Sequence, residues 1–547
     1  MTKSLVTLLF VTCSVLLRAE NSWVATLETE SLRSLQLSVS AFAQVATLPG
    51  QLDEQNSLLQ SFFSLPTLEG IHDNEPLRIY WVADSAQPVG KDVMPAQISV
   101  LPLRRETAQT LELHLFKMYK SKRTLQGITT YSVPISTNSP GCVQIHELER
   151  TLSLAPSREL LTWFQSQKTA LKACLPKKTD EILRLSINPQ LIDQVVLPKM
   201  KMDPAQGLLS DSCTYAGMGI NLDGRGCTVT FRLQPKEGSP LDQLLRDIPE
   251  PRTSFWNALP ENALFSILYT EPDKSKWSRL FASSTTNSFT SIFADLQPFL
   301  GRERLIYLAP TKSQTSFRLV QIASVTDEKA AREAVRLLGS RDNPVGFKLK
   351  HEETRTEAGQ TFEQFSLAYQ ALPQPLAAPA TTNRESASLT TLIPLFLRKA
   401  RMEVSVKNQY LFAVVANTDT LEQETPDYPF LPQRLNLQQR LTTFSTSPKI
   451  IAAGDFQLLS FLRKLLHALA PAEEQTQKIF TTITDGFQFW AVREKENTSA
   501  ISLRLSGNEI AELLKTVRED REELQDIFFN LFTRQMKPVT EAPKKNP

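Results

Sequence analysis

The chain contains few residues whose type and spacing suit catalysis. It has five histidines, and no two of them lie two to four positions apart: His72, His114, His146, His351 and His467. A metal-binding helix or strand needs such spacing to bring two imidazoles to one ion. The pairs His146-Glu147 and His351-Glu352 each begin a zinc-protease motif but lack its second histidine. The sequence therefore predicts no catalytic residue, no metal site and no cofactor.

Other local motifs also favour structural roles. Gly217-x-Gly219 falls inside a predicted strand rather than at a strand-to-helix turn, so it indicates close strand packing or a bulge instead of a dinucleotide site. No C-x-x-C motif supports redox exchange. The single aspartates Asp84, Asp223 and Asp455 fit turns or helix caps. The acidic residues among 519–523 alternate with arginines, as on a solvated helix face.

Aromatic residues gather in two places and leave two interpretations open. The predicted strands contain Tyr80, Trp81, Tyr307, Phe487, Phe489 and Trp490. Packing in a hydrophobic core is the simpler interpretation. The alternative is an apolar groove for a lipid, a peptide or a strand of a partner.

The predicted strands and helices that would position these residues occur twice along the sequence. Residues 214–248 predict strand, tight turn, strand, loop and helix, and residues 486–517 repeat this order. Phe231 is the central apolar residue of one alternating strand, and Leu503 occupies the same place 272 positions later. Each helix that follows carries four apolar residues at i, i+3, i+4 and i+7. Further matches, such as Ile79-Tyr80 with Ile306-Tyr307, extend the repetition through most of the chain.

This pattern predicts an α+β fold of two tandem duplicated domains, each a mostly antiparallel sheet with helices packed on one face. The expected units are residues 20–248 and 263–534, separated by a proline-containing junction at 249–262. Residues 27–45 are expected to form a helix within the first unit. The second unit carries an inserted loop at 368–398, and residues 535–547 read as a disordered tail. Two unrelated α+β domains remain the alternative.

The N-terminus has the composition of an export signal. Lys3 precedes an apolar run at residues 5–17, and Leu17-Arg18-Ala19 suits cleavage after Ala19. A buried N-terminal helix is the alternative. Cys13 does not favour a lipid anchor, because no small residue stands just before it. The mature chain is therefore expected to be periplasmic or extracellular, without an integral membrane segment.

Charge and cysteine content refine this expectation. Cleavage at residue 19 leaves 58 basic and 58 acidic residues, a balance that gives no electrostatic footprint for nucleic acid. The cysteines that remain are Cys142, Cys174, Cys213 and Cys227. An even number in an exported chain is compatible with one or two disulfides or with free buried thiols. The sequence does not choose among the pairings.

The pattern resembles uncharacterised exported bacterial proteins built from two α+β units, each ending in a hairpin such as AGMGINLDGRGCTVTFRL and a helix. The resemblance brings no known activity, so no site residue is carried over. We therefore expect an exported, non-catalytic binding or scaffold protein whose partner is an unknown protein or hydrophobic ligand. The alternatives are a carrier of lipids or other hydrophobic ligands, and a secreted enzyme with a dispersed active site.

Overall fold

The computed structural model of the protein describes residues 23–45, 70–82, 96–104, 122–125, 128–136, 139–146, 149–189, 211–224, 226–249, 263–271, 294–310, 317–338, 347–357, 360–369, 400–417, 449–469, 486–494 and 498–519. The predicted signal peptide, residues 370–398 of the predicted insert and the predicted tail lie outside these ranges. Asp84 and His114 also lie outside them.

The described residues divide into two compact units. The first contains the described residues up to Asp247 together with Arg493–Gly507. Its strands are β1 (Trp23–Thr29), β2 (Arg78–Val82), β3 (Ala96–Pro102), β4 (Lys122–Leu125), β5 (Ile128–Ser136), β6 (Ser139–His146), β7 (Thr151–Ala155), β8 (Leu183–Ile187), β9 (Cys213–Asp223), β10 (Gly226–Pro235) and β20 (Ser499–Ser506). Its helices are α2 (Leu32–Val45), α5 (Arg158–Lys172) and α9 (Pro240–Arg246).

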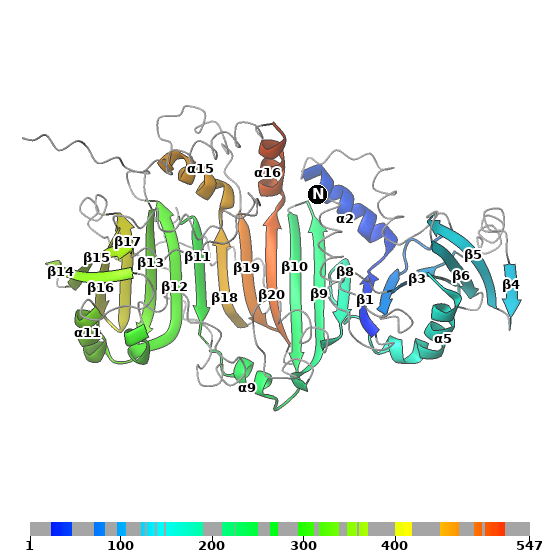
Figure 1. Ribbon diagram of the computed structural model, residues 1–547, viewed down its shortest axis with the longest axis horizontal. Coiled ribbons are helices and arrows are strands. Elements are labelled where there is room, and N and C mark those ends of the chain that lie inside the picture. Colours follow the sequence, from blue (N-terminus) through cyan, green and yellow to red (C-terminus); the bar gives the residue numbers. More distant parts are fainter. Residues whose placement is uncertain are drawn as a thin grey trace, which may run out of the picture. The chain divides into compact units, whose positions relative to one another are not determined.

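These strands form an antiparallel sheet in the order β4–β5–β6–β7–β3–β2–β1–β8–β9–β10–β20. Strand β20 comes from the far end of the chain and pairs with β10 over eight positions, from Gly226↔Ser506 to Leu233↔Ser499. Figure 1 shows β9, β10 and β20 side by side.

The second unit contains the other described residues. Its strands are β11 (Phe265–Thr270), β12 (Leu300–Pro310), β13 (Phe317–Val325), β14 (Phe347–Glu357), β15 (Gln360–Tyr369), β16 (Ala400–Lys407), β17 (Tyr410–Asn417), β18 (Lys449–Phe456) and β19 (Phe487–Arg493), the last of which ends at the boundary with the first unit. Its helices are η4 (Ala294–Phe299), α11 (Glu328–Leu337), α15 (Leu458–Leu469) and α16 (Gly507–Glu519).

Strand pairing in the second unit follows β14–β15–β16–β17–β13–β12–β11–β18. The first unit pairs β4–β5–β6–β7–β3–β2–β1–β8 in the same order. The repeated sequence pattern thus corresponds to a repeated order of strand pairing.

Local sequence signals explain several element boundaries. The Ser157 side chain accepts a hydrogen bond from the Leu160 N–H and so caps α5. Asp223 and Gly226 face one another across the predicted tight turn between β9 and β10. Gly226 has a φ of 145°, and a Cβ there would lie 2.0 Å from the Leu505 carbonyl oxygen. Glycine is therefore required where β10 begins beside β20.

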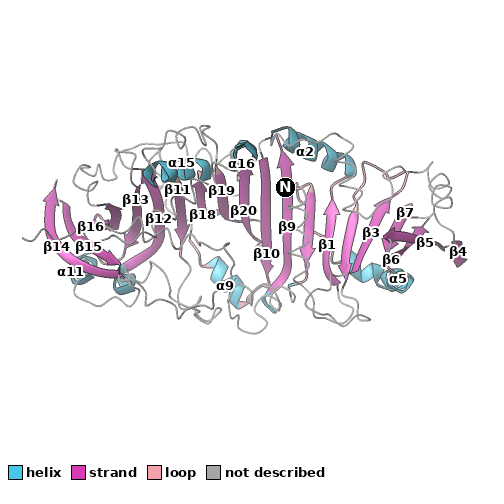
Figure 2. Cartoon of the chain, turned by 45° about the horizontal axis from the view of Figure 1, so that its top comes forward, coloured by secondary structure: helices cyan, strands magenta, loops and turns pink. Residues whose placement is uncertain are grey.

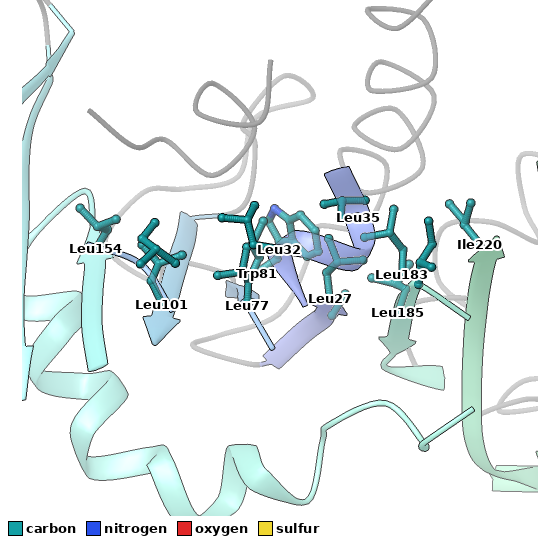
Figure 3. Packing of buried hydrophobic residues seen from close by; sticks show 14 of the residues in the cluster. Leu27, Leu32, Leu35, Leu77, Trp81, Leu101, Leu154, Leu183, Leu185 and Ile220 are labelled. Atoms are coloured by element: carbon teal, nitrogen blue, oxygen red, sulfur yellow. The ribbon is translucent and has the colours of Figure 1, made fainter. Parts of the chain in front are cut away.

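One hydrophobic core lies between α2 and one face of the first sheet. Leu32 and Leu35 of α2 pack with Leu27, Ile79 and Trp81 of the strands. Figure 3 shows Leu32 and Leu35 beside Leu27 and Trp81, with Leu183, Leu185 and Ile220 continuing the same layer. The α2 helix therefore covers this face of the sheet.

A second core lies on the opposite face of the same sheet. Tyr80 and Val82 alternate with Ile79 and Trp81 along β2 and pack with α5 residues, including Phe164. The ring centroids of Tyr80 and Phe164 are 5.2 Å apart. The prediction that helices pack on one face only is therefore wrong: both faces of a central strand were apolar enough to take a helix.

The prediction of an α+β fold with two tandem domains is also wrong. The described residues contain 20 strands but only six α-helices, so the fold is dominated by antiparallel sheet (Figure 2). The compact units do not follow chain order either, because β20, expected in the second domain, lies in the first unit against β10. An unpaired strand edge offers backbone hydrogen bonds to any strand that can reach it, so a strand can pair with one that is distant in the sequence.

One strand was missed altogether. Residues 27–45 predict a helix, but the helix begins at Leu32 and β1 occupies Trp23–Thr29. Strand β1 pairs with both β2 and β8. Its sequence, WVATLET, contains β-branched and aromatic residues, yet six of its seven side chains are buried. Burial on both faces removes the alternation that marks a half-exposed strand.

Candidate functional site

Strands β10 and β20 meet in a symmetric register. Thr230 lies directly opposite Ser502, and Phe231 lies opposite Ile501. The hydroxyl oxygens of Thr230 and Ser502 are 3.0 Å apart and share a buried hydrogen bond. This pair lies on the polar face of the sheet, whereas Phe231 and Ile501 emerge on the face that α2 covers further along.

Large apolar side chains are exposed on that second face. Phe231 is 49% exposed, Ile501 57% and Leu503 39%. The other exposed large hydrophobic side chains among the described residues are Leu37 and Leu337, on helices α2 and α11. We call Phe231, Ile501 and Leu503 the β10–β20 apolar surface. Contiguous exposed apolar groups mark interaction sites more often than single ones do.

From the alternation in sequence, these three residues are predicted to lie on the buried faces of their strands. Their alternation with polar residues is real, since Thr230 and Ser502 are buried on the opposite face. What the pattern could not show is which face would be covered. Val229 and Leu505 pack against the core to which α2 contributes, whereas Phe231 and Leu503, two positions further along each strand on the same face, remain exposed.

The polar face carries a buried ion cluster centred on Arg232 of β10. Its Nη2 lies 2.5 Å from Glu181 Oε1, and its Nε lies 3.1 Å from Glu494 Oε2. Burial alone would lower the pKa of Arg232, but the two carboxylates raise it. The guanidinium of Arg232 on β10 thus lies between two carboxylates, that of Glu181 just before β8 and that of Glu494 just after β19.

The paired glycines of β9 make room for this cluster. A Cβ at Gly219 would lie 2.6 Å from Glu181 Cδ, and a Cβ at Gly217 would lie 2.2 Å from the Tyr215 hydroxyl oxygen. The expectation of close packing at Gly217-x-Gly219 is therefore confirmed: side chains approach both glycines, and the Leu185 carbonyl oxygen of the neighbouring strand β8 would lie 2.8 Å from a Cβ at Gly217. Burial raises the pKa of the Tyr215 phenol, so it stays neutral at physiological pH.

A second buried ion cluster crosses three strands beside the first. Glu28 of β1 lies directly opposite Arg78 of β2 and Arg184 of β8. Glu28 Oε2 is 2.7 Å from Arg78 Nε, and Glu28 Oε1 is 2.9 Å from Arg184 Nη2. In a sheet, such directly opposite residues interact most strongly.

The second unit replaces this ion cluster by apolar residues. Its pairing places Ser266 opposite Tyr307 and Asp455, as Thr26 lies opposite Tyr80 and Ser186. Two residues further along the strand, the positions of Glu28, Arg78 and Arg184 are taken by Leu268, Leu305 and Ala453. At these register positions, the ion cluster is therefore found in the first unit and not in the second.

No protein-family model, curated protein or solved structure matches the chain. The arrangement of its own residues must therefore carry any functional conclusion.

His146 and His351 belong to different units and contact different groups. His146 Nε2 is 2.8 Å from Gln165 Nε2, and burial, with Lys168 nearby, lowers the pKa of His146. His351 Nε2 is 2.8 Å from Glu363 Oε2. Glu363 also accepts a hydrogen bond from Thr354 at 2.6 Å and faces Arg336 of α11. The described residues contain no group of three or more metal-ligating side chains.

The predicted roles of the aspartates are partly wrong. Asp223 lies exposed at the β9–β10 turn, as expected. Asp455, however, is buried in the middle of the second sheet and accepts a hydrogen bond from the Ser266 hydroxyl. It occupies neither a turn nor a cap. Its register position opposite Ser266 could not be read from the local sequence.

The aromatic residues belong to cores rather than to an open groove. Tyr80, Trp81, Tyr307 and Trp490 are each less than 8% exposed. Phe487 stacks on Phe456 with ring centroids 6.4 Å apart. Burial raises the pKa values of both Tyr80 and Tyr307 to about 12. The core-packing interpretation is therefore confirmed for Tyr80, Trp81, Tyr307 and Trp490, whereas Phe487 and Phe489 are half-buried.

None of the four cysteines downstream of residue 19 forms a disulfide in the structure. Cys213 and Cys227 are buried, and Cys142 and Cys174 are half-buried. Cys227 faces Leu222 across the β9–β10 hairpin, so it does not pair with Cys213. Burial raises the pKa of the Cys227 thiol to about 11, which disfavours the reactive thiolate.

Among the helices that the structure describes, none is both long enough and apolar enough to cross a membrane.

Proposed function

We propose that the chain is an exported, non-catalytic binding protein that contacts a partner protein through the β10–β20 apolar surface. One observation carries this proposal: Phe231, Ile501 and Leu503 lie on two neighbouring strands and are each 39–57% exposed. Burying such side chains against a partner is favourable by roughly 25 cal/mol per Å² of apolar area removed from water.

The chemistry of the polar face supports a binding role over a catalytic one. Glu28 and Arg232 are largely buried, and each forms two ion pairs: Glu28 with Arg78 and Arg184, and Arg232 with Glu181 and Glu494. A catalytic acid or base needs a proton that substrate can reach. The Glu28 pairs instead connect β1, β2 and β8, and the Arg232 pairs lie on the face of β10 opposite to Phe231.

Site-specific photo-crosslinking tests the proposal. A benzoylphenylalanine placed at Ile501, in cells that produce the protein, should give a discrete adduct with one partner. The matched control is the same probe at Leu337, which is 51% exposed but lies on α11. No adduct at position 501, or the same adducts at both positions, would contradict a specific binding role for this surface.

A further inference from the structure

We propose that the β10–β20 apolar surface receives one amphipathic α-helix of the partner. This inference rests on the proposed function and specifies the chemistry of the partner. It starts from the helix that already packs on the same face of the sheet.

Helix α2 already packs on the face of the sheet from which Phe231 emerges. Its Leu32 and Leu35 belong to the core that Val229 of β10 and Leu505 of β20 also contact. Phe231 and Leu503 lie two positions away from these residues along the strands, so their side chains emerge on the same face. The exposed surface therefore continues the surface on which a leucine-bearing helix of this chain is already packed.

A helix would contact several strands of this face at once. Neighbouring strands lie about 4.8 Å apart, and an α-helix with its side chains is about 10–12 Å across. A helix centred on Phe231 of β10 would thus also reach Met218, which lies opposite Phe231 on β9, and Ile501, which lies opposite Phe231 on β20.

The exposed area argues against a second copy of the chain as the occupant. Three half-exposed side chains of this size present on the order of 300 Å² together. A stable dimer buries about 800 Å² on each partner. The apolar stripe of a short helix needs far less surface, and its leucines at i, i+3, i+4 and i+7 would lie between the exposed side chains.

The side chains of the β10–β20 apolar surface also indicate which residues of the partner helix would contact it. On this face Phe231 and Leu503 are surrounded by Met218, Val229 and Leu505, which are all apolar. The arginines Arg232 and Arg504 alternate with them and emerge on the opposite face. The partner helix is therefore expected to present uncharged apolar residues to this surface and to carry its charges on its outer face.

A model peptide tests the inference with the full chain. The probe is a fluorescein-labelled peptide of about 18 residues, roughly 27 Å long as a helix, with leucines at helical spacing and equal numbers of lysine and glutamate. Its control has the same composition with leucines at alternate positions. Fluorescence anisotropy should show binding of the helical peptide and at least tenfold weaker binding of the alternating one.

Variants locate the binding. Phe231→Ser combined with Ile501→Ser should weaken binding of the helical peptide at least tenfold, whereas Leu337→Ser should leave it unchanged. Because all three residues are about half exposed, the variants are expected to fold, and a urea transition matching that of the wild type checks this.

Three outcomes would overturn the inference. These are equal binding of both peptides, binding that the double substitution does not affect, and a concentration-dependent dimer that the double substitution abolishes. The last outcome would assign the surface to a second copy. A discrete adduct at Ile501 whose crosslinked partner segment is not helical would leave the proposed function standing and reject only the helix. The absence of any adduct would remove both.

Discussion

Thr230 of β10 and Ser502 of β20 lie directly opposite one another and share a buried hydrogen bond of 3.0 Å. They are 272 residues apart, which is the spacing between Phe231 and Leu503 in the repeated pattern. Pairing on either side is symmetric, because Val229 faces Leu503 and Phe231 faces Ile501. Two equivalent strands therefore meet around a local two-fold axis that passes through this pair.

The hydroxyl pair is expected to stabilise the seam. Thr230→Val keeps the shape of the side chain but leaves the buried Ser502 hydroxyl without this partner, which should lower the free energy of unfolding by about 1–3 kcal/mol. Adding Ser502→Ala removes the second polar group and should recover part of the loss. Urea denaturation of the four proteins in this cycle measures the coupling, and strict additivity would show that the hydrogen bond contributes nothing.

Removal of the Glu28 carboxylate from its ion cluster is expected to destabilise the fold. Glu28→Ala leaves the buried Arg184 without its carboxylate and should lower the free energy of unfolding by about 3–5 kcal/mol. The matched control is Glu328→Ala, which removes the partner of the half-exposed Arg332 and should cost less than about 1 kcal/mol. Equal losses in the two variants, measured by urea denaturation, would show that burial does not decide the effect.

The Glu181 side chain is expected to leave room only for glycine at position 219. Gly219→Ala places a methyl group 2.6 Å from the Glu181 carboxyl carbon, so the free energy of unfolding should fall by about 1–3 kcal/mol. In a Glu181→Ala background the space is free, and the same substitution should cost much less. Arg232 would keep Glu494 as a partner in that background. A loss that does not depend on residue 181 would place the conflict elsewhere, for example in the backbone of β9.

Glu363 is expected to contribute stability that is lost in acid. Burial opposes its ionisation, but hydrogen bonds from Thr354 and His351 and the nearby Arg336 lower the pKa of Glu363 below 4.5. Because the folded-state pKa is the lower one, the stabilisation is fully present above about pH 5 and falls as the pH drops through the folded-state pKa. The difference in unfolding free energy between wild type and Glu363→Gln should therefore shrink below pH 4.5. A difference that stays constant down to pH 3 would contradict this assignment.

The sequence predicted the local architecture well. The hairpin at residues 213–235, the Ser157 cap of α5 and the packing at Gly219 each follow from a few neighbouring residues. Turn glycines, capping hydroxyls and alternating side chains act within a few residues of the chain. The repetition of strand order was also visible, because matched apolar patterns recur in the same order, 227 positions apart at Ile79 and Ile306 and 272 apart at Phe231 and Leu503.

The candidate site could not be found in the same way. Phe231 and Ile501 have the pattern of buried strand residues, and their exposure depends on how far the core to which α2 contributes extends along the sheet. Glu28, Arg78 and Arg184 are more than 45 residues apart in pairs, and only strand register brings them together. Neither relationship has a local sequence signal.

What the sequence by itself determined is the type and order of most elements and their repetition. Only the tertiary structure decided that β20 leaves the expected second domain to pair with β10, that helices cover both faces of one sheet, and that Thr230 meets Ser502. The reason is that propensity and alternation act between neighbours, whereas strand pairing and burial are set by contacts between residues far apart in the chain. The surface we propose for partner binding exists only because those distant contacts form.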